Sequence, residues 1–224
     1  MREFGKPVDK TRWSMTPADV NAYYSASLNQ MVFPSGILQA PFFNNDVPMS
    51  MNFGAIGMIM GHELTHGFDN QGRLFDKFGN LNDWWENKSS QAYQERADCM
   101  VNQYSAYQEY GVNLDGQFTL GENIADNGGI KIAFKAFQNW RDKHPSDTVL
   151  PLNFTAEQEF FLGMAQVWCS YKTPQHAKLM VFTDSHASDR YRVIGSMSNM
   201  PHFAKSYQCP EGSPMNPKDK CEVW

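Results

Sequence analysis

Two histidines and a glutamate, His62, Glu63 and His66, form the pattern His-Glu-x-x-His. On a helix, residues four positions apart lie on the same face, so both imidazoles could bind one ion. If that ion is zinc, each nitrogen would lie about 2.0–2.1 Å from it. Glu63 would lie beside the metal, where its carboxylate could take a proton from a water molecule. This short pattern also arises by chance, so the hypothesis needs a third ligand.

A second stretch of sequence, residues 119–129, offers that ligand. It contains Glu122 and Asp126, again four positions apart and therefore on one face of a helix. Glu122 could complete a three-ligand site and leave a fourth position for water, as a catalytic zinc requires. Asp126 could accept a hydrogen bond from the outer nitrogen of a ligand histidine. The alternative is two solvated acids on a helix surface, which the neighbouring His-Glu-x-x-His pattern makes the weaker interpretation.

The elements that must position these residues are mainly helical. The run from Phe53 is apolar and free of proline, which predicts a helix that carries both histidines and ends at Gly67. A second helix is expected from a cap at Asp83 through Tyr104. The stretch that contains Glu122 continues at helical spacing until residues 144–145, and Thr155 is expected to cap a further apolar helix.

Three other segments are expected to be non-helical. Residues 20–24 alternate and favour an edge strand. Residues 31–43 are apolar but interrupted by proline and glycine, which favours a buried irregular loop. Residues 184–192 are predicted to form a polar loop in which His186, with a nearby arginine, could hydrogen-bond a developing oxyanion. On spacing alone, an ordinary surface loop is the stronger interpretation there.

Composition and charge limit the classes of function. The chain has 224 residues and a formal net charge of −5, with no basic cluster typical of nucleic-acid binding. No apolar run is long enough to span a bilayer, and the first residues do not resemble a signal peptide, so a soluble protein is expected. Four cysteines and the sequons at Asn87 and Asn153 favour an extracellular disulfide protein with three possible pairings. Reduced, buried cysteines are the alternative.

These motifs, in this order, resemble the neprilysin family of zinc metallopeptidases, which includes the endothelin-converting enzymes. The resemblance covers nearly the whole chain. It is carried by Asn21-Ala22-Tyr23-Tyr24, Phe33-Pro34-x-Gly36-Ile37-Leu38, Gly61-His62-Glu63-Leu64-Thr65-His66-Gly67-Phe68-Asp69, Gly121-Glu122-Asn123-Ile124-Ala125-Asp126-Asn127-Gly128-Gly129, residues 184–192 and Cys221-Glu222-Val223-Trp224.

The resemblance implies a mainly α, thermolysin-like (gluzincin) catalytic domain with a short β edge element, formed as a single domain by residues 1–224. Family members are far longer, with an N-terminal membrane anchor and a large helical domain over the active site. The chain is therefore expected to be a C-terminal catalytic part without the N-terminal half. The resemblance also implies a disulfide between Cys99 and Cys221. It further implies two unpaired thiols, Cys169 and Cys209, whose partners lie in the missing half.

The resemblance also assigns roles to individual residues. His62, His66 and Glu122 would bind one Zn²⁺, Glu63 would be the base, and Asp69 and Asp126 would support the metal ligands. Asp126 would also be the proton donor, and His186 would stabilise the transition state. The substrate-binding residues implied are Asn21, Ala22, Arg192, Ile37, Phe42, Met58, Ile59, Val167 and Trp168.

The function implied is hydrolysis of short peptides on the amino side of large hydrophobic residues, at the cell surface or outside the cell. Expected partners are a peptide substrate and either an N-terminal half or another chain, with no nucleic acid. The alternative is a truncated fragment that binds zinc or peptides without turnover.

Overall fold

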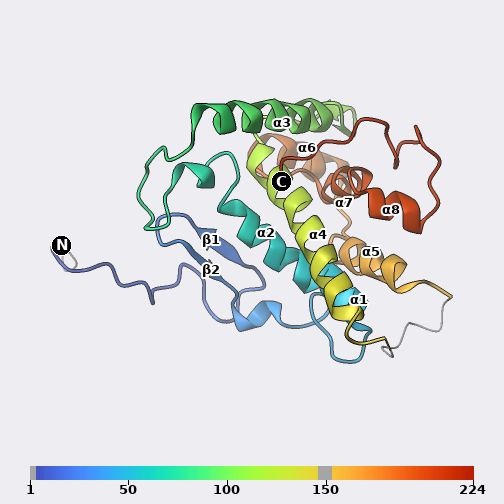
Figure 1. The fold of residues 1–224 in the computed structure, drawn as a ribbon, viewed down its shortest axis with the longest axis horizontal. Helices are drawn as coiled ribbons and strands as arrows, with labels where there is room; N and C mark the ends of the chain where they lie inside the picture. The colour runs from blue at the N-terminus through green and yellow to red at the C-terminus, as the bar shows by residue number, and fades with distance from the viewer. Residues whose placement is uncertain (1–3, 146–152) are drawn as a thin grey trace.

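The structure is a computed structural model that describes residues 4–145 and 153–224. Helices dominate it, as the sequence predicts (Figure 1). The α-helices are α1 (Met49–Asn52), α2 (Met58–His66), α3 (Asn87–Ser105), α4 (Leu120–Arg141), α5 (Ala156–Val167), α6 (Pro174–Thr183), α7 (Asp189–Ser198) and α8 (Pro201–Ser206). Of two short 3₁₀ turns, η1 (Ser35–Ile37) precedes α1 and η3 (Gly72–Leu74) lies between α2 and α3.

The helix that carries the two histidines is longer than the apolar pattern indicates. α1 continues into η2 (Phe53–Gly57), a turn of π-helix, and then into α2 without a break. The helical segment therefore begins at Met49, directly after a proline. It ends at Gly67, whose N–H donates to the carbonyl of Leu64 at 3.2 Å. The predicted end of this helix is confirmed.

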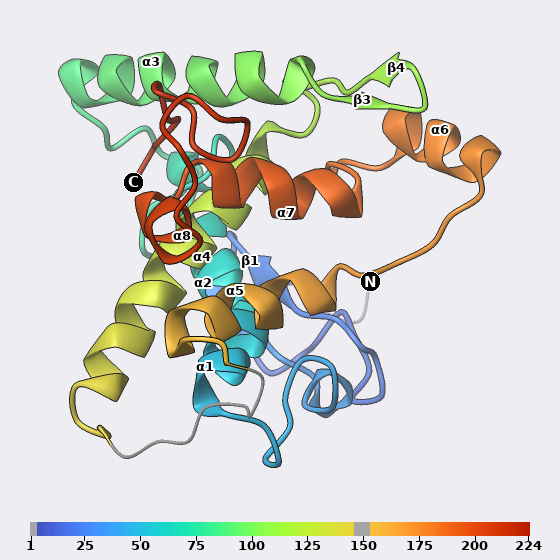
Figure 2. The same cartoon turned by 90° about the vertical axis from the view of Figure 1, so that its right-hand side faces the viewer.

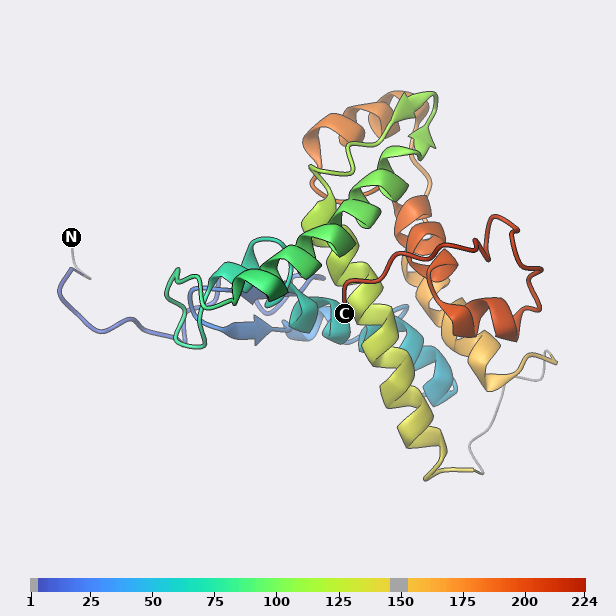
Figure 3. The ribbon, with the colours of Figure 1, turned by 45° about the horizontal axis from the view of Figure 1, so that its top comes forward.

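α2 and α4 make the most extensive contact between any two elements, and they cross near the middle of the molecule (Figures 1 and 3). Glycines allow this close approach. A Cβ atom on Gly61 would lie 2.6 Å from the carbonyl oxygen of Gly129, and one on Gly129 would lie 2.6 Å from the nitrogen of His62. Any side chain at these positions would push the helices apart. The crossing thereby brings the start of α4 beside the end of α2.

The remaining helices pack around this crossing. α5 packs against α1 and η2, and α7 packs against α4 (Figure 2). One hydrophobic cluster joins η2, α2, α4 and α5, with Phe134, Phe137, Phe160 and Phe161 at its centre. A second cluster joins α3, the start of α4 and α7. These two clusters hold α4 from both ends, so its position relative to α2 is fixed by burial.

The predicted edge strand is confirmed, although it starts later than expected. β1 (Tyr23–Ser25) pairs antiparallel with β2 (Gln30–Val32), and Asn21 and Ala22 lie just before β1. This hairpin lies beside α2 (Figure 1). A smaller hairpin, β3 (Gln108–Glu109) with β4 (Val112–Asn113), follows α3 and was not predicted.

Two boundaries predicted from sequence are wrong. α3 begins at Asn87 and not after Asp83, because the backbone is still extended at Glu86, with φ −67° and ψ 144°. Residues 189–192 are the first turn of α7 and not part of a loop. The cap at Thr155 is confirmed: its Oγ1 accepts from the N–H of Gln158 at 3.2 Å, and the Gln158 side chain accepts from the N–H of Thr155 at 2.9 Å.

The cysteines follow the pattern that the family resemblance implies. Cys99 on α3 is bonded to Cys221 near the end of the chain, while Cys169 and Cys209 are free. Both sequon asparagines, Asn87 and Asn153, are exposed. Among the residues described, no helix combines the length and apolar character needed to cross a membrane.

Candidate metal centre

The Nε2 atoms of the two α2 histidines point toward the same place. His62 Nε2 and His66 Nε2 lie 3.0 Å apart, as residues one helical turn apart can. The start of α4 adds Glu122, whose Oε2 lies 3.2 Å from His62 Nε2 and 3.4 Å from His66 Nε2. The side chain of His62 is almost fully buried, whereas His66 and Glu122 are partly accessible. The structure therefore brings the three predicted ligands together.

A carboxylate holds the other nitrogen of each imidazole. His62 Nδ1 lies 2.8 Å from Asp126 Oδ1, and His66 Nδ1 lies 2.7 Å from Asp69 Oδ2. Since a carboxylate only accepts, each Nδ1 carries the ring proton and donates it. In a neutral ring, Nε2 then carries a lone pair that can bind a metal. Such hydrogen bonds from Nδ1 to a carboxylate are typical of histidines that bind a metal through Nε2.

The geometry of the three atoms fits a metal ion. Ligand atoms about 2.0–2.1 Å from a tetrahedral zinc lie about 3.3–3.4 Å from one another. The observed separations of 3.0, 3.2 and 3.4 Å are close to that value. In addition, Glu122 Oε2 is buried, and while the neighbouring imidazoles are neutral it has no hydrogen-bond donor among the described residues. A cation at the centre of the three atoms would satisfy it.

The electrostatics of the centre favour positive charge. Burial alone would raise the pKa of Glu122, but hydrogen bonds and charge from His62 and His66 hold it well below its usual range. Burial would lower the pKa of His66, yet hydrogen bonds to Asp69 and Glu122 outweigh it and raise the pKa to about 10. The two shifts are reciprocal, because each carboxylate stabilises the charged imidazole beside it and each charged imidazole stabilises the carboxylate.

Glu63 lies next to His62 at the wall of a cleft of about 900 Å³ that opens over the centre. Its side chain is nearly buried, and burial raises its pKa. A carboxylate whose pKa is raised toward neutral holds a transferred proton more readily than an exposed one does. Its position and its pKa both suit the predicted role of base.

A buried ion pair stands behind His62. Arg192 on α7 donates from Nε to Asp126 Oδ2 at 2.8 Å and from Nη2 to Asp126 Oδ1 at 2.6 Å. Burial would raise the pKa of Asp126, but the charge and hydrogen bonds of Arg192 keep it below its usual value. The guanidinium also lies 3.8 Å from the ring centre of Trp168. Asp126 is fully buried with both oxygens engaged, which fits support of His62 and not direct contact with a substrate.

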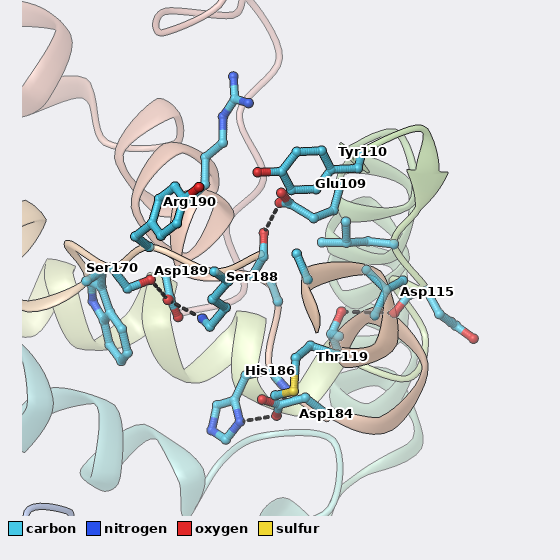
Figure 4. A pocket seen from close by; sticks show the side chains of 18 of the residues that line it. Glu109, Tyr110, Asp115, Thr119, Ser170, Asp184, His186, Ser188, Asp189 and Arg190 are labelled. Atoms are coloured by element: carbon cyan, nitrogen blue, oxygen red, sulfur yellow. Dashed lines mark hydrogen bonds and ion pairs between the residues drawn. The ribbon is translucent and has the colours of Figure 1, made fainter. Parts of the chain in front are cut away.

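His186 approaches the centre from the loop before α7. Its Nε2 lies 3.3 Å from Glu122 Oε2, and its Nδ1 lies 2.7 Å from Asp184 Oδ1 (Figure 4). Asp184 Oδ1 also accepts from the N–H of His186 at 2.9 Å, so the loop itself orients the ring. No role for Asp184 was predicted from the sequence, although an aspartate two residues before a histidine is a recognisable turn signal.

Most of the predicted site residues line the cleft. They are Asn21, Ala22, Ile37, Phe42, Ile59, His62, Glu63, His66, Asp69, Glu122, Trp168, His186 and Arg192. Met58 and Val167 do not line it, contrary to the prediction. Met58 is buried in the hydrophobic core, and Val167 packs against that core from α5. Both support the floor of the cleft from below.

Other residues that line the cleft were not predicted from the sequence. Tyr23 and Tyr24 come from β1, Asn70 and Gln71 follow α2, and Gln117 and Phe118 precede α4. Tyr23 and Tyr24 fall within the predicted edge strand, so their alternation was a usable signal. The other four lie in turns, where no periodic pattern distinguishes a cleft residue from an ordinary surface residue.

Known proteins are similar to this chain in sequence and in fold. The signature of Peptidase family M13 matches residues 21–223. Endothelin-converting enzyme 1 of Rattus norvegicus is 54% identical over 220 residues, which cover 98% of this chain and 29% of the relative. Neprilysin-3 of Drosophila melanogaster is 52% identical over 226 residues, which cover 100% of this chain and 29% of the relative.

The fold agrees with the sequence. An inhibitor complex of the zinc metalloprotease Zmp1 of Mycobacterium tuberculosis superimposes with a TM-score of 0.91 at 35% identity, covering 99% of this chain and 35% of that one. The chain thus spans about 29% of the length of the curated relatives named above. Within that span the likeness is continuous, and the chain belongs to peptidase family M13.

Proposed function

We propose that this chain is the catalytic part of a zinc-dependent endopeptidase that hydrolyses short peptides on the amino side of large hydrophobic residues. The observation that carries the proposal is the convergence of His62 Nε2, His66 Nε2 and Glu122 Oε2, 3.0–3.4 Å apart, with each Nδ1 already bonded to a carboxylate. A zinc ion held by these residues would polarise a peptide carbonyl and increase the acidity of a water molecule.

The protein groups around the centre divide the remaining chemistry. Glu63 takes a proton from the attacking water and later delivers it to the departing amine, which its raised pKa assists. In its protonated form, His186 donates from Nε2 to the oxygen on which negative charge develops, while Asp184 accepts from Nδ1 and holds the ring in place. Asp126 and Arg192 fix His62 from behind and touch no reacting atom.

The cleft beside the centre suits a large apolar side chain. Ile37, Phe42, Ile59 and Trp168 line it and are continuous with the hydrophobic core below. Such a surface gains free energy when a substrate side chain displaces water from it. We place the residue that follows the cleaved bond here. Asn21 and Ala22, which precede β1, are suited to bind the extended backbone of the substrate.

The proposal extends to the setting of the protein. The bond between Cys99 and Cys221 and the exposed sequon asparagines suit an oxidising, extracellular environment. The free thiols Cys169 and Cys209 are proposed to pair with cysteines of a further polypeptide segment that covers the cleft.

The substitution Glu63→Gln tests the mechanism. It should leave the zinc content unchanged and lower hydrolysis of a quenched fluorescent peptide by about 10²–10⁴-fold, because the base is lost while the ligands remain. Zinc content is measured by mass spectrometry on the same samples, and activity is measured with and without a chelator.

The matched control is Glu95→Gln, which changes an exposed glutamate of α3 far from the cleft. It should retain full activity. Hydrolysis by Glu63→Gln at the wild-type rate would refute the role of the base. A wild-type chain that binds zinc and peptide without hydrolysis would instead favour a non-catalytic binding fragment.

A further inference from the structure

Four side chains at one end of the cleft have no part in the chemistry proposed above. Asn70, Gln71, Gln117 and Phe118 line this end, which we call the amide-rich end. Phe118 is 47% exposed, although it is large and apolar. Within a cleft, an exposed aromatic ring is a candidate contact for a ligand. We propose that Phe118 selects an apolar residue on the amino side of the cleaved bond, a specificity that rests on the proposed peptidase function.

The position of the amide-rich end relative to the metal centre indicates which side of the cleaved bond it contacts. Gly121 on α4 approaches Asn70 and Asp69, since a Cβ on Gly121 would lie 2.9 Å and 3.5 Å from their side-chain oxygens. This is the His66 side of the centre. One turn further along α4, Asp126 meets Arg192 on the His62 side.

The apolar floor beside Arg192 receives the residue that follows the bond. An extended peptide runs in one direction through a cleft, so the residues before the bond must lie at the opposite end. Phe118 precedes Gly121 and therefore lies at that opposite end, beyond Glu122. It is thus placed to contact one of the two residues that precede the cleaved bond.

The turn that carries Phe118 is rigid. Asp115 Oδ1 accepts from the N–H groups of Gln117 at 3.0 Å and Phe118 at 2.9 Å, and Thr119 Oγ1 donates to the carbonyl of Asp115 at 2.9 Å. Asp115 and Thr119 also line a pocket that includes His186 and Asp184 (Figure 4). Because these hydrogen bonds already fix the backbone that carries the ring, less conformational entropy is lost when a ligand binds.

The charge at this end favours apolar over acidic residues. The other side chains of the amide-rich end, Asn70, Gln71 and Gln117, are neutral amides. The carboxylate of Asp115, which accepts from the N–H of Phe118, and that of Asp69 in the cleft would repel a substrate carboxylate. The expected order of preference for the contacted residue is therefore leucine or phenylalanine, then glycine, then aspartate.

The test uses two pairs of peptides that all share the residue after the cleaved bond. Each pair probes one of the two positions before the bond, where one peptide has leucine and the other has glycine. Phe118→Ala should lower kcat/KM for one leucine peptide by about tenfold and change the glycine peptide by less than about twofold. The matched control is Phe78→Ala. Phe78 is also exposed and also donates its N–H to an aspartate, Asp76 Oδ1 at 2.8 Å, but does not line the cleft. It should leave the leucine-to-glycine ratio unchanged.

A binding measurement separates this inference from the proposed function. Affinities of the same peptides for zinc-loaded Glu63→Gln, with and without Phe118→Ala, are measured by fluorescence anisotropy. A leucine preference that disappears with Phe118→Ala supports the inference even if the wild type does not hydrolyse peptides. An unchanged preference at both positions, in a variant with wild-type thermal unfolding, overturns the inference and leaves the proposed function intact.

Discussion

The two histidines of the candidate centre are supported in opposite ways. His66 is held by Asp69, three residues later, and the other oxygen of Asp69 accepts from the N–H groups of Gln71 and Gly72 at 2.8 and 2.7 Å. His62 is held by Asp126, which lies 64 positions away on α4 and depends in turn on Arg192 of α7. One support is a local turn, and the other requires three helices to be packed.

This difference separates local chemistry from tertiary structure. Asp69 belongs to the turn that ends α2, so its geometry follows from a few neighbouring residues. Asp126 and Arg192 are both almost completely buried, and a buried ion pair is favourable only when its geometry is complete. The orientation of His62 therefore depends on the packing of three helices, whereas the orientation of His66 depends on the turn alone.

The largest effect is expected for Asp126→Ala. It leaves the buried guanidinium of Arg192 without a partner, which should lower the free energy of unfolding by about 3–5 kcal/mol. Metal affinity should fall as well, since His62 loses its orienting bond. Urea unfolding of the metal-free protein and a competition titration with a zinc chelator measure the two effects.

The double variant Asp126→Leu with Arg192→Met serves as its control, because it removes both charges. It should recover much of the lost stability without recovering metal affinity. Equal stability losses for the single and the double variant would contradict the view that an unpaired arginine causes the effect.

A smaller effect is expected for Gly129→Ala at the crossing of α2 and α4. The new Cβ would meet backbone atoms of His62 and Met58, so the helices must separate, at a cost of about 1–3 kcal/mol. Metal affinity should fall because Glu122 moves away from the imidazoles. The control is Gly57→Ala, where a Cβ meets no atom closer than 3.6 Å. That variant should unfold at the wild-type urea concentration or above it, and an equal loss at both positions would rule out the crossing as the cause.

The smallest effect on stability is expected for Asp69→Ala. Loss of its hydrogen bonds should lower the free energy of unfolding by about 1–2 kcal/mol, while metal affinity should fall about 10–100-fold. Asp76→Ala is the control, since Asp76 also accepts from two backbone N–H groups but lies away from the centre. A stability loss as large as that of Asp126→Ala would erase the distinction between the two supports.

Local features made much of the fold predictable. The end of α2 at Gly67, the helix that contains Glu122 and the cap at Thr155 all follow from patterns within a few residues. The start of α7 did not, because Ser188 turns its side chain to Glu109 and not to its own helix. Packing fixes this helix: Tyr191 and Arg192 are buried. A ten-residue helix held by tertiary contacts has little signal of its own.

In the candidate site, too, local sequence predicted some residues and tertiary packing determined the others. The spacing of four residues paired His62 with His66 and Glu122 with Asp126, and the His-Glu-x-x-His pattern then favoured Glu122 as the third ligand. The border of the cleft was not predictable in this way. Met58 lies within the core although its neighbour Ile59 lines the cleft, and Phe118 lines it from a turn without any periodic pattern. Which side chains reach a cleft depends on how neighbouring elements cover them.

The bond between Cys99 and Cys221 divides the centre topologically. Glu122, Asp126, His186 and Arg192 all lie inside the closed loop of chain, whereas His62 and His66 lie outside it. A protease that cut the backbone within the loop would leave both pieces tethered through sulfur. A cut between residues 67 and 98 would release the histidine helix from every covalent link to the acid that faces it, so the integrity of the centre would then depend on packing and on the ion alone.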